Sequence, residues 1–205
     1  MKAYIEYCTT KDGVDYSKWV PSIHYDDICK HLLTLMKGGR QKVFSLGTPF
    51  ILTLVTGFES NLNDWLVIDT FEKHGPANYE ALVSGYVLVG PKQKFRLAVS
   101  VMTDNAFQVR ENSSLVKDLD ELIDVRNQLV HPKPRFYYRI SKHKVKPKRQ
   151  RAEDHPLFYL KLGDCKRYLR AVKALDRMFF SQYDRGTIKE NNLLKEITRI
   201  LRETK

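Results

Sequence analysis

A helix whose two ends are both marked in the sequence constrains this chain more than any other feature. Ser113-Ser114 offers an N-terminal cap, and apolar residues then recur at helical spacing. These residues are Leu115, Leu119, Leu122, Ile123 and Val130. Because a residue that precedes proline is pushed out of the helical region, Pro132 ends the pattern and leaves His131 beyond the last turn. We therefore expect a helix over 115–130 that ends beside an imidazole free to turn toward a ligand.

A line of polar residues follows the same helix. Its members recur at steps of four, three and four, and they are Asp120, Asp124, Asn127 and His131. Arg126 lies next to this line, whereas Leu129 and Val130 are expected to point toward the core. The spacing predicts that an arginine, an asparagine and a histidine converge at the end of the helix.

Other helical patterns predict a mainly all-α fold of about six helices. One helix is expected to be capped by Ser22 and to end at Gly38-Gly39. The further predicted helices cover 79–89, 92–102, a segment from Asp164 toward Tyr183, and a last segment through Leu201 after a capping box at 187–190.

The most apolar segment is expected to form the central core helix. Thr48 is predicted to cap it, with Pro49 in its first turn, and the helix continues through Trp65. It carries Glu59 and Asn63, which lie four residues apart on one face. These two side chains either need buried polar partners or lie at the wet edge of the helix.

Two regions have the composition of strands. Within residues 1–19, Ala3, Ile5 and Tyr7 alternate with other residues and are followed by the turn-favouring pair Asp12-Gly13, which predicts a short hairpin or an extended arm. Residues 136–140 and 157–162 are also β-leaning, and we expect them to pair as a hairpin with the segment between them as a long loop.

Length and composition predict one domain over residues 1–205, with an extended N-terminal arm (1–20) and a basic insertion (133–151). The three cysteines, Cys8, Cys29 and Cys165, are far apart and are expected to be reduced structural thiols. The first residues do not resemble a cleaved leader, and the uncharged stretch 43–58 is shorter than a membrane span. We expect a cytoplasmic protein with no membrane association.

The net charge of +11 is concentrated in the basic insertion. This segment contains nine basic residues and no acid, which leaves 26 of the 35 basic residues against 24 acidic ones elsewhere. The nine are Lys133, Arg135, Arg139, Lys142, Lys144, Lys146, Lys148, Arg149 and Arg151. Such a patch suits a polyanion such as RNA or DNA, and the alternative is a solvated loop. Tyr137 and Tyr138 lie among these charges, where they either stack on unpaired bases or pack within a strand.

The residues at the end of the 115–130 helix match the needs of ribonuclease chemistry without a metal. The Arg126 guanidinium can hold a phosphate, and the His131 imidazole exchanges protons near neutral pH. Asn127 can orient the imidazole or hold a hydroxyl. One histidine does not easily perform both proton transfers, so a symmetric homodimer with two copies of the site is expected.

The motif Arg126-Asn127-x-x-x-His131, at the end of a helix in an all-α chain, resembles the signature of HEPN domains, many of which are RNases. The family pattern allows four to six residues between the arginine and the histidine and prefers a polar residue after the arginine, as Asn127 is. The likeness extends over about residues 45–135, where the helix with Glu59 and Asn63 and the segment 92–102 resemble the helices that precede the motif.

The resemblance implies a helical bundle that dimerises across the motif. It also implies catalytic roles for Arg126 and His131, support from Asn127, and Glu59 as a further candidate. The implied reaction cleaves RNA to a 2',3'-cyclic phosphate and a 5'-hydroxyl, without metal or cofactor. Such proteins often belong to toxin-antitoxin or antiphage defence systems, so an antitoxin or regulatory protein is an implied partner.

Several alternatives compete with this hypothesis. The protein could be a noncatalytic RNA- or nucleotide-binding or adaptor module, and the motif could be a cationic cap at a helix end. His24, Asp27 and His31 share a face that could bind a metal, but a solvated face is the expectation. Asp118 and Asp120 point about 200° apart on a helix and are discarded as metal ligands. The sequence contains no phosphate-binding glycine loop.

Overall fold

The structure, a computed structural model, is mainly α-helical, as the sequence predicted. It describes the backbone of residues 5–11, 14–19, 21–105, 109–131, 137–141, 144–148 and 156–183, and the side chains of 24–105, 109–131 and 157–178. The helices in these ranges are α1 (Pro21–Met36), α2 (Arg40–His74), α3 (Tyr79–Val87), α4 (Pro91–Met102), α5 (Ser114–Val130), α6 (Pro156–Tyr159) and α7 (Leu162–Tyr183). The strands are β1 (Ile5–Lys11), β2 (Val14–Trp19), β3 (Tyr137–Ser141) and β4 (Lys144–Lys148).

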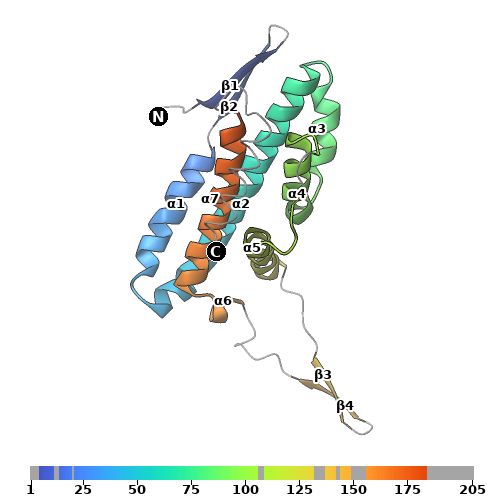
Figure 1. Ribbon diagram of the computed structural model, residues 1–205. Coiled ribbons are helices and arrows are strands. Elements are labelled where there is room, and N and C mark those ends of the chain that lie inside the picture. The colour runs from blue at the N-terminus through green and yellow to red at the C-terminus, as the bar shows by residue number, and fades with distance from the viewer. Residues whose placement is uncertain are drawn as a thin grey trace.

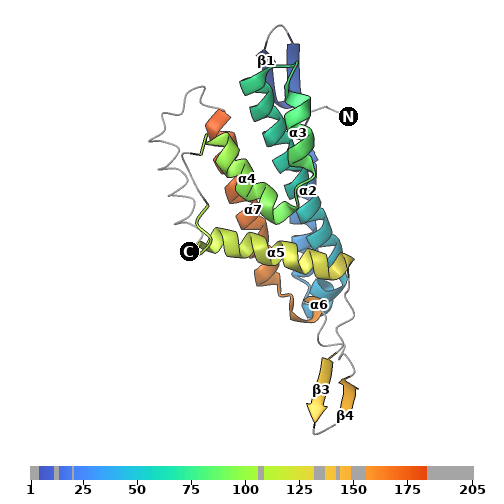
Figure 2. The same ribbon diagram turned by 90° about the vertical axis from the view of Figure 1, so that its right-hand side faces the viewer.

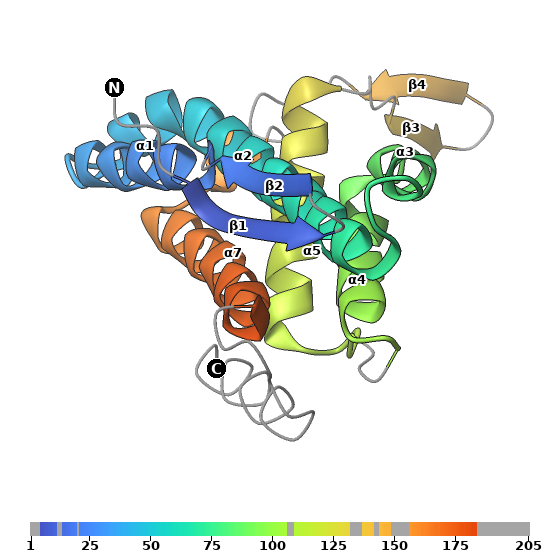
Figure 3. The same ribbon diagram turned by 90° about the horizontal axis from the view of Figure 1, so that it is seen from above.

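Helix α2 is the central helix of the molecule. It has 35 residues and contacts every other described helix. Helices α1, α2 and α7 lie side by side along the long axis, with α1 running opposite to the other two (Figure 1). Helix α5 crosses them, as Figure 2 shows. Seen from above, α3 and α4 lie on the other side of α2 from α1 (Figure 3).

Two apolar clusters form the core, and α2 contributes to both. The first cluster joins the second half of α2 to α4, the first half of α5 and the end of α7, around Trp65, Phe95 and Leu119. The second joins α1 and the first half of α2 to the start of α7, around Phe50 and Tyr168. Because α5 and α7 also contribute to both clusters, their packing fixes the direction in which α5 crosses α2.

Helix α2 begins earlier than the sequence predicted. It starts at Arg40, and Pro49 lies inside it rather than in its first turn, so the predicted cap at Thr48 is wrong. Proline in a helix interior removes one hydrogen bond and normally costs about 3 kcal/mol. Burial of Gly47, Phe50 and Ile51 on either side of the proline offsets this cost and keeps the helix continuous.

The N-terminal hairpin is confirmed, whereas the second hairpin differs from the prediction. β1 and β2 pair antiparallel with Lys11 opposite Val14, and the predicted turn residues Asp12 and Gly13 lie outside the described residues. β3 pairs with β4, inside the basic insertion, and residues 157–162 belong to α6, the linker that follows it and the first residue of α7. Ser141 of β3 pairs with Lys144 of β4, and strands so close in the sequence come together at lower entropic cost than strands joined by the long loop that we expected.

The other predicted helices are confirmed within the described residues. Helix α1 begins at Pro21, so Ser22 lies in its first turn and the predicted cap at Ser22 is wrong, whereas Gly38-Gly39 separate α1 from α2 as predicted. Helices α3 and α4 lie at the predicted positions, and the predicted start near Asp164 and end near Tyr183 match α7. The last predicted helix, through Leu201, lies outside the described residues.

The uncharged stretch 43–58 is only part of the long helix α2. By length and composition, α2 is the one helix in the described part of the chain that could cross a membrane. Many of its residues are buried against the other helices, and the core helix of a globular domain passes the same test, so this is weak evidence for a span.

Cys29 and Cys165 are buried free thiols, as expected. Burial raises the pKa of each to about 12, which keeps both sulfurs protonated and unreactive at neutral pH. The side chain of Cys8 lies outside the described residues.

The close approach of α1 to α2 at Gly57 generates a stability prediction. A Cβ atom at Gly57 would lie 2.6 Å from Tyr25 Cβ, so the Gly57→Ala variant must push the helices apart. We expect it to lose about 1–3 kcal/mol of unfolding free energy in urea denaturation. Gly85→Ala is the control, because its Cβ would meet nothing within 4 Å and alanine gains about 0.5–1 kcal/mol in a helix. Equal stability of the two variants would contradict the packing described here.

Candidate functional site

Helix α5 begins and ends where the sequence predicted. The Ser113 hydroxyl accepts a hydrogen bond from the Val116 N–H at 3.3 Å and caps the N-terminus. At the other end, the His131 N–H donates to the Asn127 carbonyl at 2.9 Å, but the His131 dihedrals (φ −124°, ψ 68°) leave the helix. His131 is therefore the C-cap residue of α5.

The motif residues lie on the open side of this helix end. Arg126 and Asn127 are half-buried, and His131 is exposed. The Arg126 Nη1 donates to the Asn127 Oδ1 at 3.0 Å, which holds the guanidinium against the amide. In the described part of the chain, no hydrogen bond or ion pair joins the exposed His131 side chain to another residue, so the imidazole remains accessible.

Two of the four residues in the predicted polar line form ion pairs with α4, and the other two lie beyond these pairs. Asp120 pairs with Arg96 at 2.8 Å, and Asp124 pairs with Lys92 at 2.7 Å, so α4 neutralises the first two members. Asn127 and His131 follow beyond these ion pairs. The sequence could not show this division, because α4 covers only part of the face.

The prediction that Val130 points toward the core is wrong. Val130 is 42% exposed, because the final turn of α5 extends beyond the clusters that bury Leu119 and Ile123. Leu129 is partly buried against the second cluster.

Glu59 and Asn63 have a partner that the sequence analysis missed. Lys94 of α4 is buried, and its Nζ donates to the Asn63 Oδ1 at 2.8 Å and to the Val87 carbonyl at 3.0 Å. Burial lowers the pKa of Lys94, and the negative charge of Glu59 opposes this shift. Lys94 precedes the buried Ala98 by four residues, and this spacing could have revealed a lysine on the apolar face of α4. The catalytic role of Glu59 remains a prediction.

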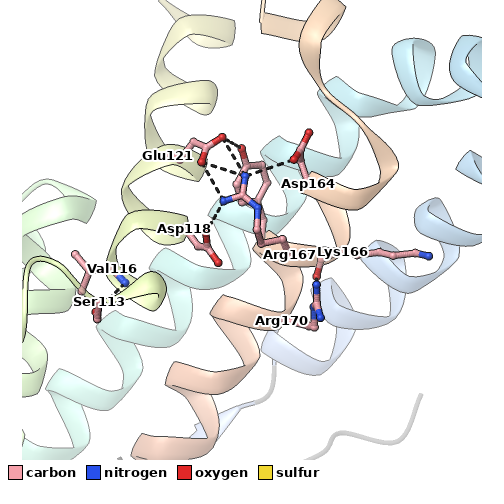
Figure 4. A network of polar contacts seen from close by, with 9 residues as sticks. Ser113, Val116, Asp118, Glu121, Asp164, Lys166, Arg167 and Arg170 are labelled. Atoms are coloured by element: carbon pink, nitrogen blue, oxygen red, sulfur yellow. Dashed lines mark hydrogen bonds and ion pairs between the residues drawn. The ribbon is translucent and has the colours of Figure 1, made fainter. Parts of the chain in front are cut away.

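A second polar network fixes α5 to α7. Arg167 of α7 pairs with Asp118, with Glu121 at 3.0 Å and with Asp164 at 3.4 Å (Figure 4). The Tyr168 hydroxyl donates to the Glu121 carboxylate at 2.8 Å. These contacts, together with the buried apolar side chains of α5, hold the helix that carries the motif.

The discarded metal-ligand patterns are structural. Asp118 and Asp120 pair with arginines of two different helices, as their opposite directions on α5 require. Asp27 pairs with Lys30 at 3.2 Å on the exposed face of α1. Among the described residues, no three side chains gather as metal ligands.

The basic insertion is described only at its two strands. Their register aligns Tyr137 with Lys148 and Arg139 with Lys146, and Ser141 with Lys144. These aligned positions alternate with a second set that contains Tyr138, Ile140, Val145 and Pro147, so most of the basic positions fall on one face of the hairpin. The hairpin lies beyond the α6 end of the bundle (Figures 1 and 2). The remaining predicted binding residues, Lys133, Arg135, Lys142, Arg149 and Arg151, lie outside the described residues.

Comparison with protein-family models, with curated protein sequences and with solved structures finds no match to this chain.

The Arg167 network predicts a pH-dependent loss of stability in the Arg167→Gln variant. We expect the variant to lose about 1–3 kcal/mol of unfolding free energy at neutral pH, because it leaves the mostly buried Asp118 without a cation. Hydrogen bonding from Arg167 lowers the pKa of Glu121, so this part of the stability exists above the unfolded pKa of about 4.3 and is lost as pH falls through the folded value.

The difference in unfolding free energy between the wild type and Arg167→Gln should therefore become smaller below about pH 4, as measured by urea denaturation over a pH series. Arg170→Gln is the control, since Arg170 is exposed and, among the described residues, donates only to a carbonyl of its own helix. A difference that does not change with pH would show that Glu121 draws no stability from Arg167.

Proposed function

We propose that this protein is a metal-independent endoribonuclease of the HEPN type that acts as a homodimer. One observation carries the proposal: the end of α5 presents an exposed His131 and a half-buried Arg126, with Asn127 holding the guanidinium. The basic insertion begins two residues after His131, so the cations that attract a polyanion adjoin the proposed site.

In the proposed reaction, Arg126 binds the scissile phosphate and stabilises the charge that develops on its oxygens. His131 takes the proton of the 2'-hydroxyl, and the 2'-oxygen attacks phosphorus. The bond from phosphorus to the 5'-oxygen breaks, and the partner's His131 donates a proton to that oxygen. The products are a 2',3'-cyclic phosphate and a 5'-hydroxyl, so no metal or cofactor takes part.

The proposal includes a biological setting. A cytoplasmic ribonuclease that cuts cellular or phage RNA needs an inhibitor in the resting cell. An antitoxin or another regulatory protein is the partner that we propose for this role.

Two substitutions test the proposed catalytic residues. Arg126→Ala and His131→Ala should each lower the rate of RNA cleavage in the presence of chelator by at least about 100-fold, because each removes a group that acts in the transition state. Product ends should carry the cyclic phosphate. Arg170→Ala and His74→Ala are matched controls on exposed helical positions and should cleave at the wild-type rate. Cleavage that survives both active-site substitutions would remove these residues from the mechanism.

A noncatalytic RNA- or nucleotide-binding or adaptor module is the second candidate, and the nine cations of the basic insertion favour it. In that case the wild type binds RNA without forming products, and His131→Ala leaves the affinity unchanged. Deletion of residues 142–151 removes six of the nine cations, and it should weaken binding and flatten its dependence on salt. Titrations of labelled RNA at several salt concentrations measure both effects, and an unchanged salt slope would exclude the insertion as the binding element.

A further inference from the structure

A groove with a volume of about 590 Å³ lies where the turn between α1 and α2 meets α6 and the start of α7. Three cations, Lys37, Arg40 and Lys161, line it together with the aromatic residues Phe158 and Tyr159. No Asp or Glu is among its lining residues. The charge and the aromatic rings together distinguish it from an ordinary apolar depression.

Among the described residues, no carboxylate forms an ion pair with the cations of this groove, whereas six cations elsewhere on the bundle are paired. Lys30, Lys73, Lys92, Arg96, Arg167 and Lys173 each pair with a carboxylate. Within the described ranges, Lys37 and Lys161 have no such partner, and Arg40 makes only a long hydrogen bond of 3.5 Å to the Phe158 carbonyl. The sequence explains the difference, since residues 28–58 contain no Asp or Glu. Unpaired cations around a concave surface attract anions.

The aromatic side chains of α6 remain open to solvent beside these cations. Tyr159 is 62% exposed and Phe158 is 37% exposed. The Phe158 ring lies 5.1 Å from the Phe44 ring of α2, centroid to centroid, so one aromatic is anchored to the bundle and the next is free. Exposed aromatic faces next to cations provide the stacking surface on which single-stranded nucleic acids place their bases.

The groove lies at the same end of the molecule as the motif. Helix α6 contacts α5, and Leu157 and Leu160 share the second apolar cluster with Leu122 and Leu129 of α5. Figure 2 shows α6 directly below the end of α5 that carries His131. A short stretch of one nucleic acid strand could therefore contact both.

We propose that this groove binds single-stranded RNA, with one base stacked on Tyr159 and with phosphates bound by Lys37, Arg40 and Lys161. This inference rests on the proposed function and adds to it, because it requires the RNA to be unpaired on one side of the scissile phosphate. An acidic peptide would satisfy the cations but would not need the exposed Tyr159 ring, so the aromatic residue separates the two ligands.

Binding of a labelled single-stranded 2'-O-methyl RNA to the full chain tests the groove independently of cleavage, because this RNA has no free 2'-hydroxyl. Tyr159→Ser should weaken binding by at least about fivefold, and Tyr159→Phe should restore it, since stacking of one base contributes about 1–3 kcal/mol. Tyr159 is exposed, so neither substitution disturbs the core. Binding of Tyr159→Ser within twofold of the wild type would overturn the proposal.

Lys37→Gln and Lys117→Gln form a matched pair, because both residues are exposed and Lys117 lies near the opposite end of α5 from His131. Lys37→Gln should reduce the salt slope of binding by about 0.7, and Lys117→Gln should leave it unchanged. Equal slopes for the pair, or competition by polyglutamate as strong as that by unlabelled RNA, would contradict an RNA groove.

Experiments can refute the ribonuclease activity and the RNA groove independently of each other. If the wild type does not cleave RNA but Tyr159→Ser still weakens binding, the groove stands and the ribonuclease activity does not. If Arg126→Ala abolishes cleavage while Tyr159→Ser binds and cleaves normally, the ribonuclease stands and the groove is wrong.

Discussion

The burial of α2 within two apolar clusters is the constraint on which the rest of the structure depends. Its large apolar side chains contact α1, α4, α5 and α7, and they keep the helix continuous through Pro49. Helix α5 is fixed against this core by Leu119 and Leu122 and by the ion pairs of Arg167. The last turn of α5 extends past the core, and this extension leaves His131 accessible. The candidate site is therefore a consequence of where the core ends.

Among the described residues, positive charge without acidic partners is found at the α6 end of the molecule. Within the bundle, Lys92, Arg96 and Arg167 pair with carboxylates on a neighbouring helix, and these pairs hold helices together rather than attract ligands. At the α6 end, the groove beside Tyr159 and the strands of the basic insertion carry positive charge without acids. A polyanion approaching this end would meet the motif, the groove and the hairpin together, which is the arrangement that a ribonuclease of the proposed kind requires.

The sequence predicted α1, α4, α5 and α7 from their apolar periodicity and from the glycine, proline, serine or aspartate at their ends, and it predicted α3 as a short segment closed by Gly90-Pro91. The predicted start of α2 was wrong because proline usually lies in the first turn of a helix. In this helix, burial of the residues around Pro49 stabilises the turns that precede it. The sequence also placed the second hairpin across a long loop, whereas strands close in the sequence come together at lower entropic cost. The spacing of Lys94 and Ala98 could have placed this lysine on the apolar face of α4, but its partners from α2 and α3 become known only when the helices are packed.

The central claim is that the imidazole at the end of α5 contacts RNA, and NMR of the histidine side chains tests it most directly. The chain has six histidines, and the His131→Ala variant assigns the signals of His131. Titration with 2'-O-methyl RNA should shift and broaden the His131 ring signals while His74, near the other end of α2, stays unchanged. Unchanged His131 signals at RNA concentrations that saturate binding would contradict the account.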